Sequence, residues 1–149
     1  MRPILLTLAL AMALGHASCS ADDTTTKPRD GMKIRLKLED RVITATLIDS
    51  KTTQDFISLP PLRLTMNDLF RREKFGHLPR AISKEGKRTN TYEVGDIAYW
   101  SPGPDVAIFY RHDGQEIPDP GIIVIGKIDS GVEALDVPGS VSVTVELIK

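Results

Sequence analysis

The chain has 149 residues, a formal net charge of −1 and 41% hydrophobic residues. Apart from its N-terminus, this is the composition of one ordinary globular domain, which is large enough to bury roughly two-thirds of its unfolded surface without a disulfide or a metal ion. The near-neutral charge excludes the strongly basic or acidic classes that bind nucleic acid or anionic membrane surfaces through charge alone. We therefore expect no nucleic-acid partner.

Residues 1–21 have the pattern of a signal peptide. Arg2 supplies a positive charge, and the apolar run from Ile4 to Leu14 is shorter than the roughly twenty residues that span a bilayer. Cleavage after Ala17 or after Ala21 would leave small residues at both positions that a signal peptidase reads. The sequence therefore predicts an exported protein of the bacterial periplasm or cell envelope.

Cys19 offers a second interpretation of the same segment. It is the single cysteine, and a lone cysteine in an exported chain calls for an explanation. Its surroundings resemble a bacterial lipobox, although His16 stands where an aliphatic residue is expected. Lipidation of Cys19, which would be the only contact with a membrane, and plain secretion with Cys19 removed both remain open.

The rest of the chain divides into a tether and a domain. Residues 22–31 are polar and without core-forming side chains, which is typical of a flexible spacer. Residues 32–149 carry apolar residues in alternation, which predicts half-buried strands. The strands expected from such alternation, or from unbroken apolar runs of strand length, cover residues 33–38, 42–47, 62–66, 95–100, 106–110, 122–128 and 141–147.

Two short helices are expected between these strands. Asp49 and Ser50 are good N-cap residues for a helix over residues 51–59, which the two prolines that follow would end. A second helix is expected from Asn67 to Phe75. Its apolar Leu69 and Phe70 would face the core, and its charged residues would remain in solvent: Arg71, Arg72, Glu73 and Lys74.

About eight short strands and one or two short helices indicate a mainly β protein. Closure of the sheet into a small barrel would remove its edges, and the apolar alternation fits a barrel that side chains fill. The order in which the strands pair does not follow from periodicity.

Four segments resemble the bacterial cyclophilin-like family of small exported or cytosolic proteins. The resemblance extends over residues 32–149, and it implies an eight-stranded cyclophilin-like β-barrel whose ends are closed by helices. It brings no established activity with it. The segments are DFISLPPLRLTMNDL (55–69), EKFGHLP (73–79), GDIAYWSPGPDVAIFY (95–110) and IIVIGKIDSGVEAL (122–135).

The hairpin around residues 92–112 contains several aromatic residues and the single tryptophan. Tyr99, Trp100 and Tyr110 are predicted to line a pocket at the mouth of the barrel, where small ligands commonly bind. Arg63 would add a cation for a carboxylate or a carbonyl. The main hypothesis is therefore a module that binds a small molecule or a peptide, against the simpler interpretation that these aromatics are core and strand surface.

Two other functions stay open. In genuine cyclophilins a groove arginine lies beside aromatic residues, and the sequence Phe109-Tyr110-Arg111-His112 is similar to the strand that bears it. Prolyl cis-trans isomerisation of exported proteins, with Arg111 and Phe109 as the groove pair, is thus the alternative hypothesis. The third is a structural interaction protein with a barrel that has no cavity.

Neither a metal site nor a cofactor site is expected. His77 and His112 are not grouped with carboxylates at ligand spacing, and Gly103 lies between prolines that lack the backbone donors a phosphate needs. A run of basic residues is interrupted by Glu73 and Glu85 and is interpreted as a solvated face: Arg71, Arg72, Lys74, Arg80, Lys84, Lys87 and Arg88.

Overall fold

Between residues 31 and 149, which the computed structural model describes, nine strands form one antiparallel sheet. The predicted signal peptide, Cys19 and all of the predicted tether except Gly31 lie outside the described residues. The strands are β1 (Lys33–Lys37), β2 (Val42–Leu47), β3 (Leu62–Leu69), β4 (Glu73–His77), β5 (Arg88–Thr89), β6 (Asp96–Trp100), β7 (Asp105–Phe109), β8 (Ile122–Ile128) and β9 (Val141–Leu147).

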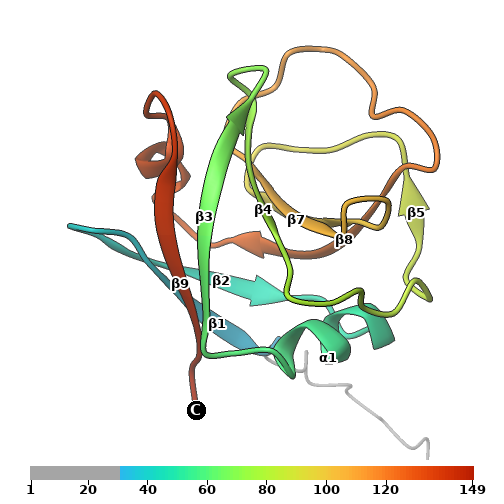
Figure 1. Cartoon of the computed structure of the whole chain (residues 1–149), viewed down its shortest axis with the longest axis horizontal. Helices are drawn as coiled ribbons and strands as arrows, with labels where there is room; N and C mark the ends of the chain where they lie inside the picture. Colours follow the sequence, from blue (N-terminus) through green and yellow to red (C-terminus); the bar gives the residue numbers. More distant parts are fainter. Residues whose placement is uncertain (1–30) are drawn as a thin grey trace, which may run out of the picture.

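The sheet closes on itself. Its order is β2-β1-β9-β3-β4-β7-β6-β8, and a further pairing between β2 and β8 joins the two ends. The short strand β5 pairs with β8 and lies outside this ring at the right of Figure 1. The predicted fold class, a mainly β protein with a small closed eight-stranded barrel, is confirmed.

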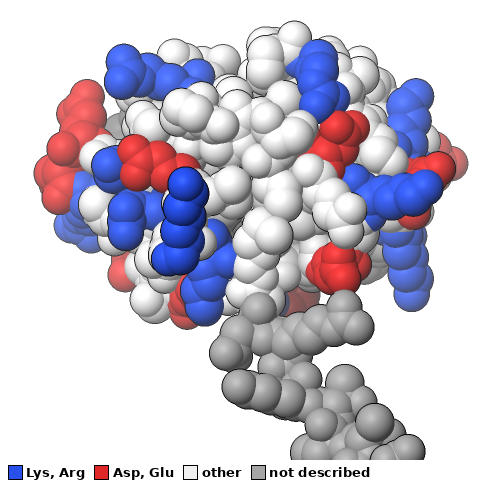
Figure 2. Space-filling view, turned by 90° about the horizontal axis from the view of Figure 1, so that it is seen from below, with Lys and Arg blue, Asp and Glu red and all other residues white. Residues whose placement is uncertain are grey.

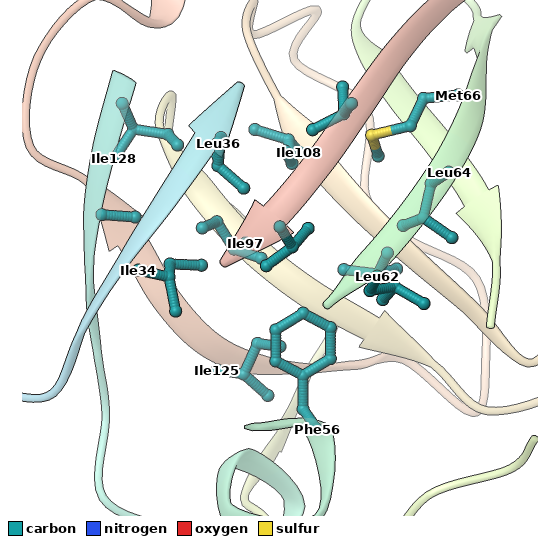
Figure 3. Packing of buried hydrophobic residues seen from close by; sticks show 14 of the residues in the cluster. Ile34, Leu36, Phe56, Leu62, Leu64, Met66, Ile97, Ile108, Ile125 and Ile128 are labelled. Carbon is teal, nitrogen blue, oxygen red and sulfur yellow. The ribbon is translucent and has the colours of Figure 1, made fainter. Parts of the chain in front are cut away.

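The alternation predicted from the sequence points one set of side chains into the barrel. In β1, Ile34 and Leu36 are buried. The residues that alternate with them, Lys33, Arg35 and Lys37, lie on the outer surface of the barrel. Ile97 of β6 and Ile108 of β7 face them from across the interior (Figure 3). These inward residues form the main core.

The helix α1 (Lys51–Ile57) closes one end of this core. The Ser50 hydroxyl caps it by accepting a hydrogen bond of 3.1 Å from the Thr53 amide. Phe56 projects from the helix into the barrel, where it packs beside Ile125 and Leu62 (Figure 3). The predicted helix is confirmed, although it ends two residues before the expected position at Leu59.

Figure 2 shows this end of the barrel from below, with lysine and arginine side chains interspersed with carboxylates on both sides of an uncharged middle. No single-sign surface is visible there, as the small net charge leads one to expect. Within residues 31–149, no helix is both long enough and apolar enough to cross a membrane.

The second predicted helix, from Asn67 to Phe75, is wrong. Strand β3 continues to Leu69, the chain turns at Phe70 and Arg71, and β4 returns alongside it. Both turn residues have positive φ angles, 56° and 52°, which are the conformation of the tight turns that connect hairpins. Neither is a glycine or an asparagine, so the sequence carried no turn signal.

The hairpin also changes the environment of the charged residues beside the turn. Phe70, expected in the core, is 71% exposed, whereas Arg72, Glu73 and Lys74, expected in solvent, are 5%, 7% and 0% exposed. The interpretation of the basic run as a uniformly solvated face is therefore wrong at Arg72 and Lys74.

Lys74 points into the barrel and is fully paired there. Its Nζ lies 2.9 Å from Asp68 Oδ1, and it donates to the carbonyl oxygens of Val137 and Gly139 at 2.6 and 2.7 Å. These two carbonyls follow the 3-10 helix η1 (Val132–Leu135), which leads from β8 to β9. Lys74 thus fastens the η1–β9 connection to the barrel.

A second apolar cluster lies on the outer face of the barrel. In β7, Val106 and Ile108 belong to the inner core, whereas Ala107 and Phe109 point outward and pack with Tyr92, Ile117 and Ile122. The segment of residues 110–121 covers this cluster: in Figure 1 it arches from the end of β7 past the β3–β4 turn to β5. The barrel wall is therefore buried on both faces at β6 and β7.

Candidate functional site

A cavity of about 210 Å³ opens on the outer face of the barrel, between strands β4, β6 and β7 and residues 110–121. We call it the outer-face cavity. Its walls are largely apolar, with an ion pair and one further carboxylate among them. The lining residues are Leu69, Phe70, Arg72, Glu73, Phe75, Trp100, Asp105, Ala107, Phe109, Ile117, Pro118 and Ile122.

The register of the strands assembles this wall from alternate residues. Phe75 of β4 pairs with Ala107 of β7, and Trp100 of β6 pairs with Asp105 of β7. Because side chains on directly paired residues lie on the same face of a sheet, all four project outward together. Ala107 contributes only a methyl group, and this small side chain leaves space between the larger residues around it.

The segment of residues 110–121 is held over the cavity by backbone hydrogen bonds at both of its ends. The amides of Tyr110 and Arg111 donate to the Arg72 carbonyl at 3.0 and 3.2 Å, and the Ile117 amide donates to the Asn90 carbonyl at 2.7 Å. The Asn90 side-chain amide adds a bond of 2.8 Å to the Ile117 carbonyl. Ile117 is thereby placed as part of the cavity wall.

Arg72 and Glu73 form the polar edge of the cavity. The guanidinium Nε and Nη2 donate to Glu73 Oε2 at 2.9 and 2.7 Å, and Nη1 lies 3.4 Å from Asp113 Oδ2. Burial raises the pKa of Glu73 above its ordinary value, and the ion pair with Arg72 offsets only part of that shift.

Aromatic rings surround the same guanidinium. Its carbon lies 5.3 Å from the centre of the Phe70 ring, 5.2 Å from that of Tyr92 and 5.8 Å from that of Phe109. Such cation–π contacts stabilise a desolvated cation. Tyr92 also stacks on Phe109 and donates to Asp113 at 2.8 Å, so the arginine has a fixed position.

Asp105 supplies a second carboxylate at the other side of the cavity. The residue is 8% exposed, and its buried Oδ1 lies 2.5 Å from His77 Nδ1, with which it forms an ion pair when the imidazole is protonated. Burial raises the pKa of Asp105, and the neighbouring imidazole lowers it by a smaller amount. The His77 side chain itself is 72% exposed.

The size of the cavity limits what it can hold. Pockets for drug-sized ligands measure roughly 300–1,000 Å³, whereas an apolar cavity of about 150 Å³ already accepts benzene. The outer-face cavity, at about 210 Å³, therefore fits one amino-acid side chain or a fragment of similar size.

The four residues predicted to bind a ligand do not lie together. Trp100 lines the outer-face cavity. Tyr99 is fully buried in the inner core, where its hydroxyl accepts a hydrogen bond from the Ile82 amide at 3.3 Å. Tyr110 also belongs to the inner core, and its hydroxyl donates to Asp68. Neighbouring positions on β6 therefore serve opposite faces of the barrel wall.

Arg63 lies away from these aromatics. It is exposed on the outer face of β3, beside Thr144 of β9, in a separate and more open depression that Leu38 and Glu39 also line. Arg111, the arginine of the alternative hypothesis, is 49% exposed and pairs with Asp136 at 2.6 Å. It does not line the outer-face cavity, in which Arg72 lies beside Phe109 instead.

Sequence reasoning missed most of this site. Arg72, Glu73 and Phe75 lay in the segment interpreted as a helix, and Asp105 was interpreted as part of a loop. The segment Glu73–His77 has Phe75 as its single large apolar side chain, so no alternation of apolar and polar residues could have identified β4. In the part of the chain that the structure describes, no three or more histidine, cysteine or carboxylate residues are grouped so as to hold a metal ion.

Fold and cavity together define a small closed barrel with an aromatic recess on its outer wall. Residues 36–146 match the model of the Cyclophilin-like family, and the chain belongs to this family. No curated protein matches the sequence. The fold is also similar to the solution structure of a hypothetical protein from Archaeoglobus fulgidus, with 27% sequence identity and a TM-score of 0.65 over 80% of this chain and 96% of the other.

Proposed function

We propose that the protein is a binding module whose outer-face cavity receives one apolar group, such as a side chain of a peptide or a small aromatic molecule. The observation that supports this is the composition of the cavity wall, in which Phe75, Trp100 and Phe109 surround a recess with an ordered ion pair at its edge. Apolar walls with a few fixed polar groups are the usual composition of ligand sites.

The β3–β4 turn gives independent support. Phe70 is both exposed and held at a positive φ, beside the cavity and over the Arg72 guanidinium. A residue other than glycine in this conformation costs about 1–3 kcal/mol, and besides hairpin turns such residues cluster at active sites and ligand clamps. A bound apolar group would cover part of the Phe70 ring, which is otherwise in water.

Mapping of amide chemical shifts during titration with a small aromatic amide tests this proposal. The expected shifts are concentrated at residues 69–75, 100–109 and 117–122. Shifts concentrated at Arg63 and β9 instead, or no saturable shifts at millimolar probe, would contradict it.

Prolyl isomerisation is a second candidate, because a guanidinium lies beside an aromatic ring in the cavity. The pair would be Arg72 and Phe109 rather than Arg111 and Phe109. An isomerisation assay on a chromogenic proline peptide decides it. Acceleration that Arg111→Ala preserves and Arg72→Lys abolishes would support catalysis, whereas rates unchanged by micromolar protein would exclude it.

We further propose that this binding takes place outside the cytoplasm, in the bacterial cell envelope. The signal-peptide pattern of residues 1–21 supports export, and the sequence around Cys19 leaves lipid anchoring as the alternative to a free mature chain. The mass of the N-terminal peptide of mature protein distinguishes the two, because a diacylglycerol on Cys19 adds a mass that secretion does not.

A further inference from the structure

Glu73 uses only one of its two carboxylate oxygens within the protein. Its side chain is 9% exposed, and the two Arg72 donors, Nε and Nη2, reach the same oxygen, Oε2. The other oxygen, Oε1, accepts no hydrogen bond from any residue between 31 and 149. A carboxylate oxygen that is withdrawn from bulk water and has no donor lacks the interaction that would offset its desolvation.

This open oxygen is accessible from the outer-face cavity. Among residues 31–149, Asp105 Oδ1 is the one completely buried side-chain oxygen or nitrogen that lacks a hydrogen bond. Glu73 Oε1 therefore keeps some accessible surface, and the open space beside Glu73 is the cavity that it lines. A ligand in the cavity can reach Oε1 and donate a hydrogen bond to it.

The wall of the cavity also contains an open donor. The indole N–H of Trp100 donates to no acceptor in the part of the chain that the structure describes, and Trp100 lines the same cavity as Glu73. The N–H of a tryptophan usually finds a partner when it is covered. One small cavity thus has both an acceptor and a donor to satisfy.

Charge and hydrogen-bonding capacity together select the chemical group that fits. The Arg72 guanidinium already compensates the Glu73 carboxylate, so a neutral donor leaves the charges of the ion pair balanced. An amide is neutral and carries an N–H donor and a carbonyl acceptor in one planar unit. A carboxylate would be repelled by Glu73 Oε1, and an ester would bring no donor to it.

We infer that the ligand of the outer-face cavity is an amide, whose N–H donates to Glu73 Oε1 while its apolar part occupies the aromatic recess. This inference rests on the proposed function and specifies its ligand class. The amide has two possible sources, a peptide bond next to an apolar side chain or the carboxamide of a small molecule.

Calorimetric titration of the full-length protein with N-methylbenzamide and methyl benzoate tests the inference. The two probes have nearly the same shape and differ in that an N–H of the amide replaces an oxygen of the ester. An apolar cavity without an open acceptor would favour the less polar ester, because the amide N–H would lose its hydrogen bond to water. We expect the amide to bind about tenfold or more tighter than the ester, and benzoate to bind weakest.

A third amide distinguishes the two sources. N-acetylphenylalanine N-methylamide presents peptide bonds on both sides of an apolar side chain. Its binding more tightly than N-methylbenzamide would identify a peptide as the source, and its binding more weakly would identify a small carboxamide. Both results require an amide in the cavity and support the inference.

Two variants assign the preference to Glu73. Glu73→Gln keeps the shape of the side chain, but its carbonyl pairs with Arg72 and its NH₂ group replaces the open acceptor. The preference for the amide over the ester is expected to disappear. Asp136→Asn makes the same change in the ion pair with Arg111, outside the cavity, and the preference is expected to persist in it.

A measurement on the unmodified protein serves if Glu73→Gln does not fold. The carboxyl carbon resonance of Glu73 should shift on saturation with N-methylbenzamide and much less with methyl benzoate, because only the amide donates to the carboxylate.

The possible failures differ. Equal or tighter binding of the ester, persistence of the amide preference in Glu73→Gln, or an unchanged Glu73 resonance on amide binding would overturn this inference and leave the proposed function standing. Absence of binding by every probe would overturn the proposed function and this inference together.

Discussion

Arg72 and Glu73 are adjacent in sequence, yet their side chains meet in a buried ion pair in which Nε and Nη2 donate to one carboxylate oxygen at 2.9 and 2.7 Å. Successive residues of a strand point to opposite faces, but Arg72 precedes β4 and belongs to the turn after Phe70 and Arg71. The turn therefore directs both side chains to the outer-face cavity.

Arg72→Met should make stability strongly dependent on pH. The substitution leaves the buried Glu73 carboxylate without its cation, which costs about 3 kcal/mol or more where the acid is ionised. Burial already raises the folded-state pKa of Glu73 above 4.5, and loss of Arg72 raises it further. Stability is then retained below the unfolded pKa and lost as the pH rises through the folded pKa.

Urea unfolding at about pH 5 and about pH 8 measures this effect, with a larger loss expected at the higher pH. Arg111→Met is the matched control, because Arg111 is half-exposed in its pair with Asp136 and contributes less than about 1 kcal/mol. Equal losses in the two variants, or a loss that does not grow with pH, would contradict the assigned role of the ion pair.

Lys74→Met should destabilise the fold by about 3 kcal/mol. The substitution removes the donor for Asp68 and for two backbone carbonyls, all of which are held by one fully buried ammonium. Lys37→Met is the control, since Lys37 is exposed and pairs with Glu146 on the barrel surface. Equal denaturant midpoints for the two variants would contradict the role of Lys74 in holding the η1–β9 connection to the barrel.

Arg71→Gly should stabilise the domain by up to about 1 kcal/mol. Arg71 has a φ of 52°, which glycine adopts without the clash that a Cβ brings. The hydrogen bond from the residue 71 amide to Asp68, at 3.1 Å, is a backbone contact and survives the substitution. Arg63→Gly is the control, because glycine at an exposed strand position is expected to destabilise the domain. Thermal melts that rank the two variants in the opposite order would contradict the assignment of backbone strain to Arg71.

The strands of the barrel were predicted well where apolar and polar residues alternate along the chain. The two-residue alternation at β1, β2 and β9 identified strands because each of them buries one face in the inner core. The same rule failed at residues 67–75, where Phe70 and Arg71 form a turn without the usual turn residues and Lys74 occupies an inward position through its hydrogen bonds.

The candidate site was less predictable than the fold. Trp100 was found because it is the single tryptophan, but Tyr99 and Tyr110 belong to the inner face of the wall. The outer-face cavity depends on the pairing of β4 with β7 and on the cover formed by residues 110–121. Both are long-range features, and the spacing of residues along the chain does not encode them.

The most direct test of the binding proposal uses the fluorescence of Trp100, the single tryptophan and a wall residue of the outer-face cavity. Titration with phenylalanine amide should give a saturable change in the unmodified protein and none in Ala107→Leu, whose larger side chain fills the space above the cavity floor. Arg63→Ala, outside the cavity, should titrate like the unmodified protein. A titration without a saturable change, or one that Ala107→Leu leaves intact, would contradict binding in this cavity.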